Sequence, residues 1–269
     1  MPCLPLLPLT RRVTVLAMAA LALPTRADLP ALVVASRPSV LPVGIYDPLA
    51  SPRFSFRGSG FVVGDGRLLV TNAHVLPDMK TTPQPQLAVL VAARGETAQG
   101  RRATVVSVDP AHDLALLRIE GPPLPALTLA DADSVREGMD VALMGYPIGG
   151  VLGYSTVTHR GIIASITKIA LPSLAARNLD AKVISRLRDG PFEVYQLDAT
   201  AYPGNSGGPL LNAATGEVVG VINMVMVRGT RESALSNPTG ITYAIPVRFV
   251  RELLQRQEAA PGAAASSPR

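Results

Sequence analysis

Cysteine, histidine and aromatic residues are scarce in this chain. Of its 269 residues one is cysteine (Cys3), three are histidine and none is tryptophan, and aromatic residues make up 4%. One cysteine cannot build a disulfide framework, and three histidines without ligand spacing leave nothing from which to build a zinc site. The sequence also lacks a phosphate-binding loop of the Walker type. We therefore expect neither a metal nor another cofactor.

The first 27 residues have the pattern of a secretory signal peptide. The basic pair Arg11-Arg12 precedes an apolar stretch at 13–23, and small residues surround the expected cleavage after Ala27. The apolar stretch is too short to span a membrane. We predict a periplasmic or secreted protein without a stable membrane span in its mature form. An uncleaved anchor and a twin-arginine export signal remain alternatives.

Removal of residues 1–27 changes the charge balance. The whole chain has 25 Lys and Arg against 20 Asp and Glu, a formal net charge of +5. Arg11, Arg12, Arg26 and Cys3 all lie in the leader, so the mature chain keeps 22 basic residues and no cysteine. Its net charge is then about +2, without a basic stripe or an aromatic stacking motif. We expect no nucleic-acid partner and no disulfide.

Short runs rich in Val, Leu and Ile, separated by Gly, Pro or Asp, predict two groups of β-strands. The first group is 54–63, 67–71, 87–92, 102–108 and 114–119. The second group is 140–145, 155–167, 193–197, 209–211, 218–225 and 242–245. A proline-rich linker at 122–125 separates them. Strands this short and regular predict small antiparallel barrels, at about 52–121 and about 138–250.

Four other segments do not have the strand pattern. Residues 28–51 are interrupted by prolines and are expected to form an irregular arm. The segment 169–188 has apolar residues at every fourth position, which predicts an inserted helix: Leu171, Ala175, Leu179, Val183 and Leu187. That helix either covers one end of the second barrel or acts as a lid or oligomer contact. A C-terminal amphipathic helix is expected at 247–255, and a disordered tail at 258–269.

The run Gly-Asn-Ser-Gly-Gly-Pro-Leu at 204–210 places a serine in a turn suited to a nucleophile. Glycines beside Ser206 leave room for a substrate backbone. The amides of Gly204 and Ser206 can converge on one point, with Asn205 shaping the turn between them. Such a pair of amides is an oxyanion hole.

Two upstream residues complete the chemistry that this serine requires. A serine hydroxyl is a weak nucleophile until a neutral imidazole removes its proton, and His74 is the candidate base. A carboxylate on the other ring nitrogen fixes the tautomer and stabilises the imidazolium, and Asp113 is the candidate. Asp113 precedes the apolar run 114–117, so we expect it at the edge of a buried strand. His112 and His159 are expected to be structural.

Five ordered blocks of the sequence resemble trypsin-like serine proteases of the chymotrypsin fold, nearest the bacterial HtrA/Deg group. The blocks are 58–63, 69–75, 113–117, 204–210 and 240–246, and together they cover about residues 55 to 250. The resemblance implies an all-β domain at 28–257 built from two six-stranded antiparallel barrels. It implies that His74 and Asp113 come from the first barrel and Ser206 from the second. We expect no PDZ domain within the 269 residues.

The same resemblance assigns a substrate pocket. Its base falls at Thr200, and its walls at Val221, Ile222 and Asn223. Thr200 carries no negative charge, so cleavage after Lys or Arg is not expected, and the apolar walls favour small or medium aliphatic residues.

The sequence therefore predicts a serine endopeptidase that forms an acyl-enzyme on Ser206 and acts on proteins or peptides. One alternative is a catalytically idle protease-fold module that binds extended peptides. Another is an esterase that uses the same triad. No oligomeric state is predicted.

Overall fold

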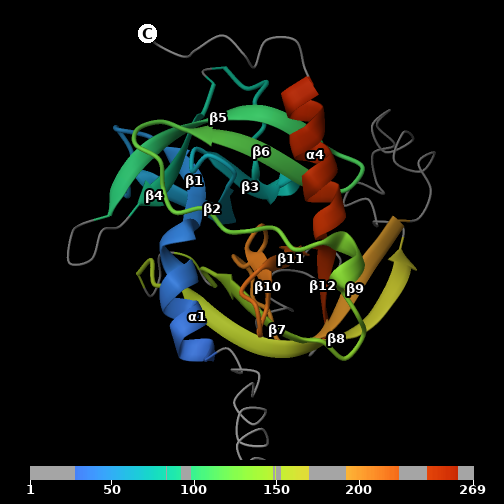
Figure 1. Cartoon of the computed structure of the whole chain (residues 1–269). Coiled ribbons are helices and arrows are strands. Elements are labelled where there is room, and N and C mark those ends of the chain that lie inside the picture. The colour runs from blue at the N-terminus through green and yellow to red at the C-terminus, as the bar shows by residue number, and fades with distance from the viewer. Residues whose placement is uncertain are drawn as a thin grey trace, which may run out of the picture.

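The computed structural model describes most of the chain and shows two closed β-barrels (Figure 1). It describes residues 28–82, 84–91, 98–147, 149, 153–169, 192–223 and 241–259. The first barrel is drawn in blue to green and the second in yellow to orange-red (Figure 1). The predicted signal peptide, residues 170–188 of the predicted inserted helix and residues 260–269 of the predicted tail lie outside the described residues, while Ile169, the first residue of that predicted helix, ends a β-strand.

Each barrel contains six strands, and all their pairings are antiparallel. The first has the order β1-β2-β3-β6-β5-β4, from β1 (Val40–Tyr46), β2 (Phe54–Val63), β3 (Leu68–Asn72), β4 (Gln86–Val91), β5 (Gln99–Asp109) and β6 (Leu114–Ile119). The second has the order β10-β11-β12-β9-β8-β7, from β7 (Asp140–Gly145), β8 (Val157–Ile169), β9 (Phe192–Asp198), β10 (Pro209–Asn212), β11 (Val218–Asn223) and β12 (Ile241–Pro246). The predicted all-β class with two six-stranded barrels is confirmed.

The prediction of an irregular arm at 28–51 is wrong. This segment contains helix α1 (Leu29–Ser36) and then β1, so the first barrel begins at residue 40 and not at about 52. Pro42 concealed the strand in the sequence because proline cannot donate a ladder hydrogen bond. At this position β1 pairs only with β2, and β4 joins from Val43 onward, so the strand has one neighbour where the proline lies.

Separate hydrophobic cores fill the two barrels. The first-barrel core includes Val43, Val62, Leu69, Val89 and Leu117, and the second includes Val141, Leu143, Ile163, Leu197 and Leu210. These side chains are almost fully buried, and each contributes on the order of 1.5–3 kcal/mol through removal from water. Each barrel therefore has a hydrophobic core of its own.

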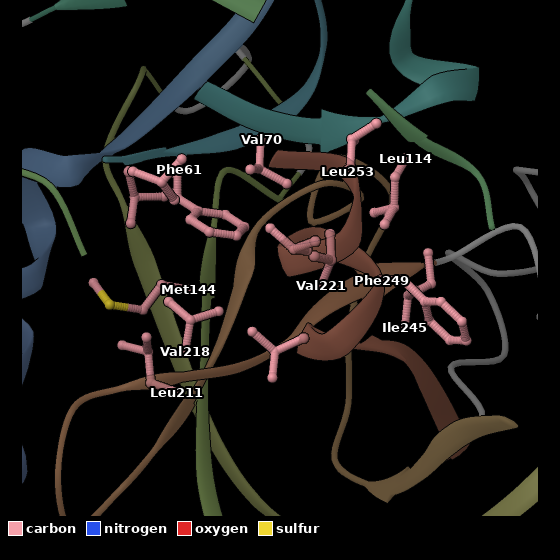
Figure 2. Packing of buried hydrophobic residues seen from close by; sticks show 14 of the residues in the cluster. Phe61, Val70, Leu114, Met144, Leu211, Val218, Val221, Ile245, Phe249 and Leu253 are labelled. Carbon is pink, nitrogen blue, oxygen red and sulfur yellow. The ribbon is translucent and has the colours of Figure 1, made fainter. Parts of the chain in front are cut away.

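A third cluster joins the barrels, and Figure 2 shows its packing. The first barrel contributes Phe61, Val70 and Leu114, the second contributes Met144, Leu211, Val218, Val221 and Ile245, and the C-terminal helix contributes Phe249 and Leu253. This core fixes one barrel against the other. It therefore determines how residues on facing loops of the two barrels meet.

The predicted C-terminal helix is confirmed as α4 (Val247–Ala259), which lies alongside both barrels (Figure 1). Because the helix continues to residue 259, the prediction that the disordered tail begins at 258 is wrong for its first two residues. The arginines of α4 bond to each part of the domain in turn. Arg248 donates to Glu193 of the second barrel at 2.8 Å, and Arg251 donates to the carbonyl of Ala130 in the segment between β6 and β7. Arg256 donates to Asp109 at the end of β5 in the first barrel. The helix is thus a brace across the barrel interface.

Among the described residues, no helix combines the length and apolar character required to cross a membrane.

Candidate active site

His74 and Asp113 lie together at the end of the first barrel that faces the second. A short 3₁₀ helix, Ala73–Val75, follows β3 and carries His74, and the turn between β5 and β6 carries Asp113. The two atoms His74 Nδ1 and Asp113 Oδ2 are 2.6 Å apart. The backbone N–H of His74 also donates to Asp113 Oδ1 at 2.9 Å. The carboxylate thus holds both the ring and the backbone of the histidine.

The turn that presents Asp113 has an unusual backbone. Asp113 has φ +54°, in the left-handed region, and it is the one non-glycine residue with positive φ among the described residues. Aspartate tolerates this region better than most residues. Its carbonyl accepts hydrogen bonds from Asn72 Nδ2 and from the backbone N–H of Ala73, both at 3.0 Å. The chain before His74 therefore holds the turn in place.

Asn223 supplies a third hydrogen bond to the same carboxylate, which the sequence did not predict. Its Nδ2 donates to Asp113 Oδ2 at 2.8 Å, and the residue is fully buried at the end of β11. The assignment of Asn223 to a pocket wall needs correction, because its amide lies against Asp113. An asparagine that ends a buried apolar strand must find a polar partner, which was the available signal.

Ser206 lies in a tight turn between β9 and β10 and is 6% exposed. Its neighbours Gly204 and Gly207 have φ +107° and +84°, values that glycine adopts without strain. The backbone N–H of Gly207 donates to the carbonyl of Ile222 at 2.9 Å, and that of Gly208 donates to Asn205 at 2.9 Å. The bond to Ile222 attaches the serine turn (residues 204–208) to β11 of the second barrel, and the bond to Asn205 closes the turn itself.

The serine turn also lies directly against the first barrel. The backbone N–H of Ser59 in β2 donates to the carbonyl of Ser206 at 2.8 Å. A Cβ atom on Gly207 would lie 2.2 Å from the carbonyl oxygen of Ser59 and 2.4 Å from Thr71 Oγ1. A Cβ on Gly58 would meet both Val75 and the carbonyl of Ser206. The glycines thus allow the turn to reach the strand end that leads to His74.

The remaining residues of the predicted oxyanion hole occupy the same turn. The carbonyl of Gly204 accepts a hydrogen bond from Ser59 Oγ, and the backbone N–H of Asn205 donates to Tyr202 at 3.0 Å. The Asn205 side chain is fully buried and packs where Gly145 has no side chain. Asn205 therefore packs against the end of β7.

The predicted pocket residues differ in how far they are buried. Thr200 is half-buried just after β9, at the start of the segment that leads to the serine turn. Val221 belongs to the core between the barrels, and Ile222 to the core of the second barrel. Both are fully buried, because β11 is covered on both faces. The prediction that their side chains form open pocket walls needs correction.

His112 lies beside Asp113 in sequence but has other partners. Its Nδ1 lies 2.9 Å from Asp109 Oδ2, and its ring stacks on Phe249 of α4 at 3.7 Å. Burial alone would raise the pKa of Asp109, but hydrogen bonds from His112 and Arg256 outweigh it and hold the pKa well below its usual range. The ring of His112 thus joins the Asp113 turn to the helix.

His159, the third histidine, lies on β8 with its ring 5.7 Å from that of Tyr202. Burial lowers the pKa of His159 and favours the neutral ring.

In the described part of the chain, no group of three or more His, Cys, Asp or Glu side chains could hold a metal ion.

Comparison with known proteins places the chain among peptidases. The family described as Trypsin-like peptidase domain matches residues 58–221. Mitochondrial serine protease HTRA2 from Bos taurus is 37% identical over 202 residues, which are 75% of this chain and 36% of that protein. The Drosophila willistoni protein of the same name is 33% identical over 205 residues, 76% of this chain and 39% of that protein. The chain thus spans less than half the length of these relatives.

Solved structures of HtrA-type proteases are also similar to this chain. The HtrA-type protease AlgW with a decapeptide has a TM-score of 0.60 and 25% identity, covering 86% of this chain and 67% of that chain. AlgW with a tripeptide has a TM-score of 0.58 and 26% identity, covering 85% and 62%. These likenesses confirm the resemblance inferred from the five sequence blocks.

Proposed function

The chain belongs to the trypsin-like peptidase family, and we propose that it is a serine endopeptidase whose triad is Ser206, His74 and Asp113. The observation that carries this proposal is the 2.6 Å contact between His74 Nδ1 and Asp113 Oδ2 beside the serine turn. With Nδ1 bound to the carboxylate, the tautomer places the ring's basic lone pair on Nε2. That is the nitrogen available to accept a proton from Ser206.

In the proposed reaction, Ser206 Oγ attacks the carbonyl carbon of a peptide bond while His74 Nε2 takes the hydroxyl proton. The carbonyl oxygen becomes an oxyanion, which the amides of Gly204 and Ser206 stabilise. As the intermediate collapses, the C–N bond breaks and His74 returns the proton to the leaving amine. Water then hydrolyses the acyl-enzyme, with His74 again as base.

Asp113 does not exchange a proton in this scheme. Its carboxylate stabilises the imidazolium that forms on His74 during each step. Three donors fix that carboxylate: the backbone and ring of His74, and the amide of Asn223. We propose that Asn223 is a positioning residue that acts through Asp113.

Proteins or peptides are the proposed substrates, and two structural neighbours are described with bound peptides. We propose that the primary pocket has its base at Thr200, which lacks a carboxylate, so that substrates with Lys or Arg before the cleaved bond are not preferred. From the pattern of residues 1–27, we also propose export to the periplasm or the medium.

The test is cleavage of casein by the purified protein and by Ser206→Ala. We expect the parent to cleave casein and the variant to lose at least about 10⁴-fold in kcat, because alanine keeps the backbone amide while it removes the nucleophile. A small-ester substrate assayed in parallel distinguishes the esterase. Cleavage of casein by Ser206→Ala at the parent rate would refute the triad, and a parent inactive on both substrates would favour the idle peptide-binding module.

A further inference from the structure

Ser59 is a fully buried serine of the first barrel that touches the serine turn of the second. It lies within β2, 0% exposed, and the turn is about half the chain away in sequence. Its hydroxyl donates to the carbonyl of Gly204 at 2.6 Å and accepts from the backbone N–H of Tyr146 at 3.0 Å. One side chain thus bridges the turn and the end of β7.

The backbone of Ser59 reaches the same turn. Its N–H donates to the carbonyl of Ser206 at 2.8 Å, and its carbonyl accepts from Thr71 Oγ1 at 2.7 Å. Ser59 therefore contacts both residues whose amides are proposed to form the oxyanion hole. In both contacts Ser59 binds the carbonyl oxygen of the residue.

The hydroxyl of Ser59 controls one particular peptide plane, the one between Gly204 and Asn205. The carbonyl of this plane is held by Ser59 Oγ, and its N–H is held by the carbonyl of Tyr202 at 3.0 Å. Gly204 has φ +107° and no side chain, so nothing in the residue itself limits rotation of the plane. The plane is the spacer between the Gly204 and Ser206 amides, and its orientation determines whether they converge.

We propose that Ser59 is a positioning residue for the oxyanion hole, a role that depends on the serine endopeptidase function proposed above. Without the hydroxyl, the Gly204 carbonyl is buried without its donor and the Tyr146 amide loses its acceptor. The Gly204 carbonyl then favours an orientation of the plane in which it finds another donor, because buried polar groups are usually hydrogen-bonded. The first barrel thereby sets the geometry of a site whose donors belong to the second.

The test compares Ser59→Ala with the parent enzyme on a peptide substrate. We expect kcat to fall about 10- to 100-fold with KM nearly unchanged, since donors displaced from the oxyanion act in the transition state more than in the ground state. Affinity for a peptide aldehyde, which forms a tetrahedral adduct, falls by the same factor. Affinity for a product peptide changes less than about 3-fold. Ser59→Cys, with a weaker donor, gives an intermediate kcat.

Two control variants separate positioning from general destabilisation. Ser134→Ala removes a serine hydroxyl that donates to the carbonyl of Asp131, also at 2.6 Å, in a surface turn. Val89→Ala weakens the first-barrel core. Both controls should keep the parent kcat at a temperature where each protein is folded. The proposal is overturned if Ser59→Ala keeps the parent kcat, or if Val89→Ala loses kcat and aldehyde affinity to the same extent.

The outcomes also distinguish the two proposals. If the parent has no Ser206-dependent activity, the endopeptidase function fails. If the parent is active and Ser59→Ala equals it in kcat and aldehyde affinity, only the positioning role fails. If Ser59→Ala does not fold, Ser59→Cys carries the same comparison.

Discussion

The two halves of the candidate active site are assembled in different ways. In the first barrel, the carboxylate of Asp113 binds the backbone and ring of His74, and Asn72 and Ala73 bind the Asp113 carbonyl. These bonds form within one barrel. In the second barrel, the turn that carries Ser206 lies against Ser59 and Thr71 of the other barrel. The proposed base is held mainly by bonds within its own barrel, with one further hydrogen bond to Asp113 from Asn223 of the second barrel, whereas the proposed nucleophile lies in a turn that contacts the other barrel directly.

This difference indicates what each half depends on. The His74–Asp113 pair follows from the ends of β3 and β6, which pair with each other in the first barrel. The serine turn depends on the core between the barrels and on the brace α4, because these set how closely the barrels approach. Changes at the interface should therefore affect the nucleophile more than the base.

The largest effect after loss of the nucleophile is expected for Asp113→Asn. Asparagine tolerates the left-handed backbone, so the fold should persist. An amide beside Nδ1 favours the wrong tautomer of His74, and we expect kcat to fall about 10⁴-fold. Steady-state kinetics together with a thermal melt checks this. A variant within 10-fold of the parent kcat would remove Asp113 from the mechanism.

The second prediction tests the interface directly with Gly207→Ala. The new Cβ would lie 2.2 Å from the Ser59 carbonyl, so the turn must move away from the first barrel. We expect kcat to fall at least about 100-fold, because a shift of about 1 Å can have that effect. Peptide cleavage assays measure kcat, and unfolding curves measure the stability of the variant.

Gly138→Ala is the matched control for this variant. Gly138 has φ +80°, close to that of Gly207, but a Cβ there would meet nothing within 4 Å. It carries the same backbone strain, about 1–2 kcal/mol, without a clash. It should be mildly destabilised and fully active. Equal activities of the two alanine variants would show that contact with the first barrel does not position the serine turn.

The smallest effect is expected at Asp109, which joins the turn of Asp113 to α4. Its pKa is held below the usual range in the folded protein, so its contribution to stability is fully present above the unfolded-state pKa of about 4. That contribution is lost as the pH falls from there toward the folded-state pKa. Asp109→Asn should lower the free energy of unfolding by about 1–3 kcal/mol at pH 7.

Urea unfolding at pH 7 and at pH 3 checks the pH dependence. The difference between the parent and Asp109→Asn should narrow at the lower pH, because Asp109 of the unfolded parent then gains a proton while the folded state still holds the carboxylate ionised. A difference that is constant or that widens toward acid would contradict the assignment of these hydrogen bonds.

Most of the fold could be predicted from the sequence, because apolar strands and turn residues are local signals. The bounds of β2, β6 and β7 agree with the predicted ranges. β1 was missed, since Pro42 suggests an irregular segment until its one-sided pairing is known.

Residues of the site could be predicted where the signal is a short motif, and could not where it is a contact between residues far apart in the sequence. Ser206 could be located from its own glycine-rich turn. The contact of Asn223 with Asp113 joins residues 110 apart, and that of Ser59 with Gly204 joins residues 145 apart. Such contacts depend on how the barrels pack, which no short motif records.

The most direct test of the proposed mechanism is to label the folded protein with a fluorophosphonate and map the modified residue by mass spectrometry. Ser206 Oγ should attack phosphorus and expel fluoride, so that one label is found on Ser206. His74→Ala should slow the labelling at least about 100-fold, because no base then takes the proton. A label on another serine, or labelling of His74→Ala at the parent rate, would contradict the account.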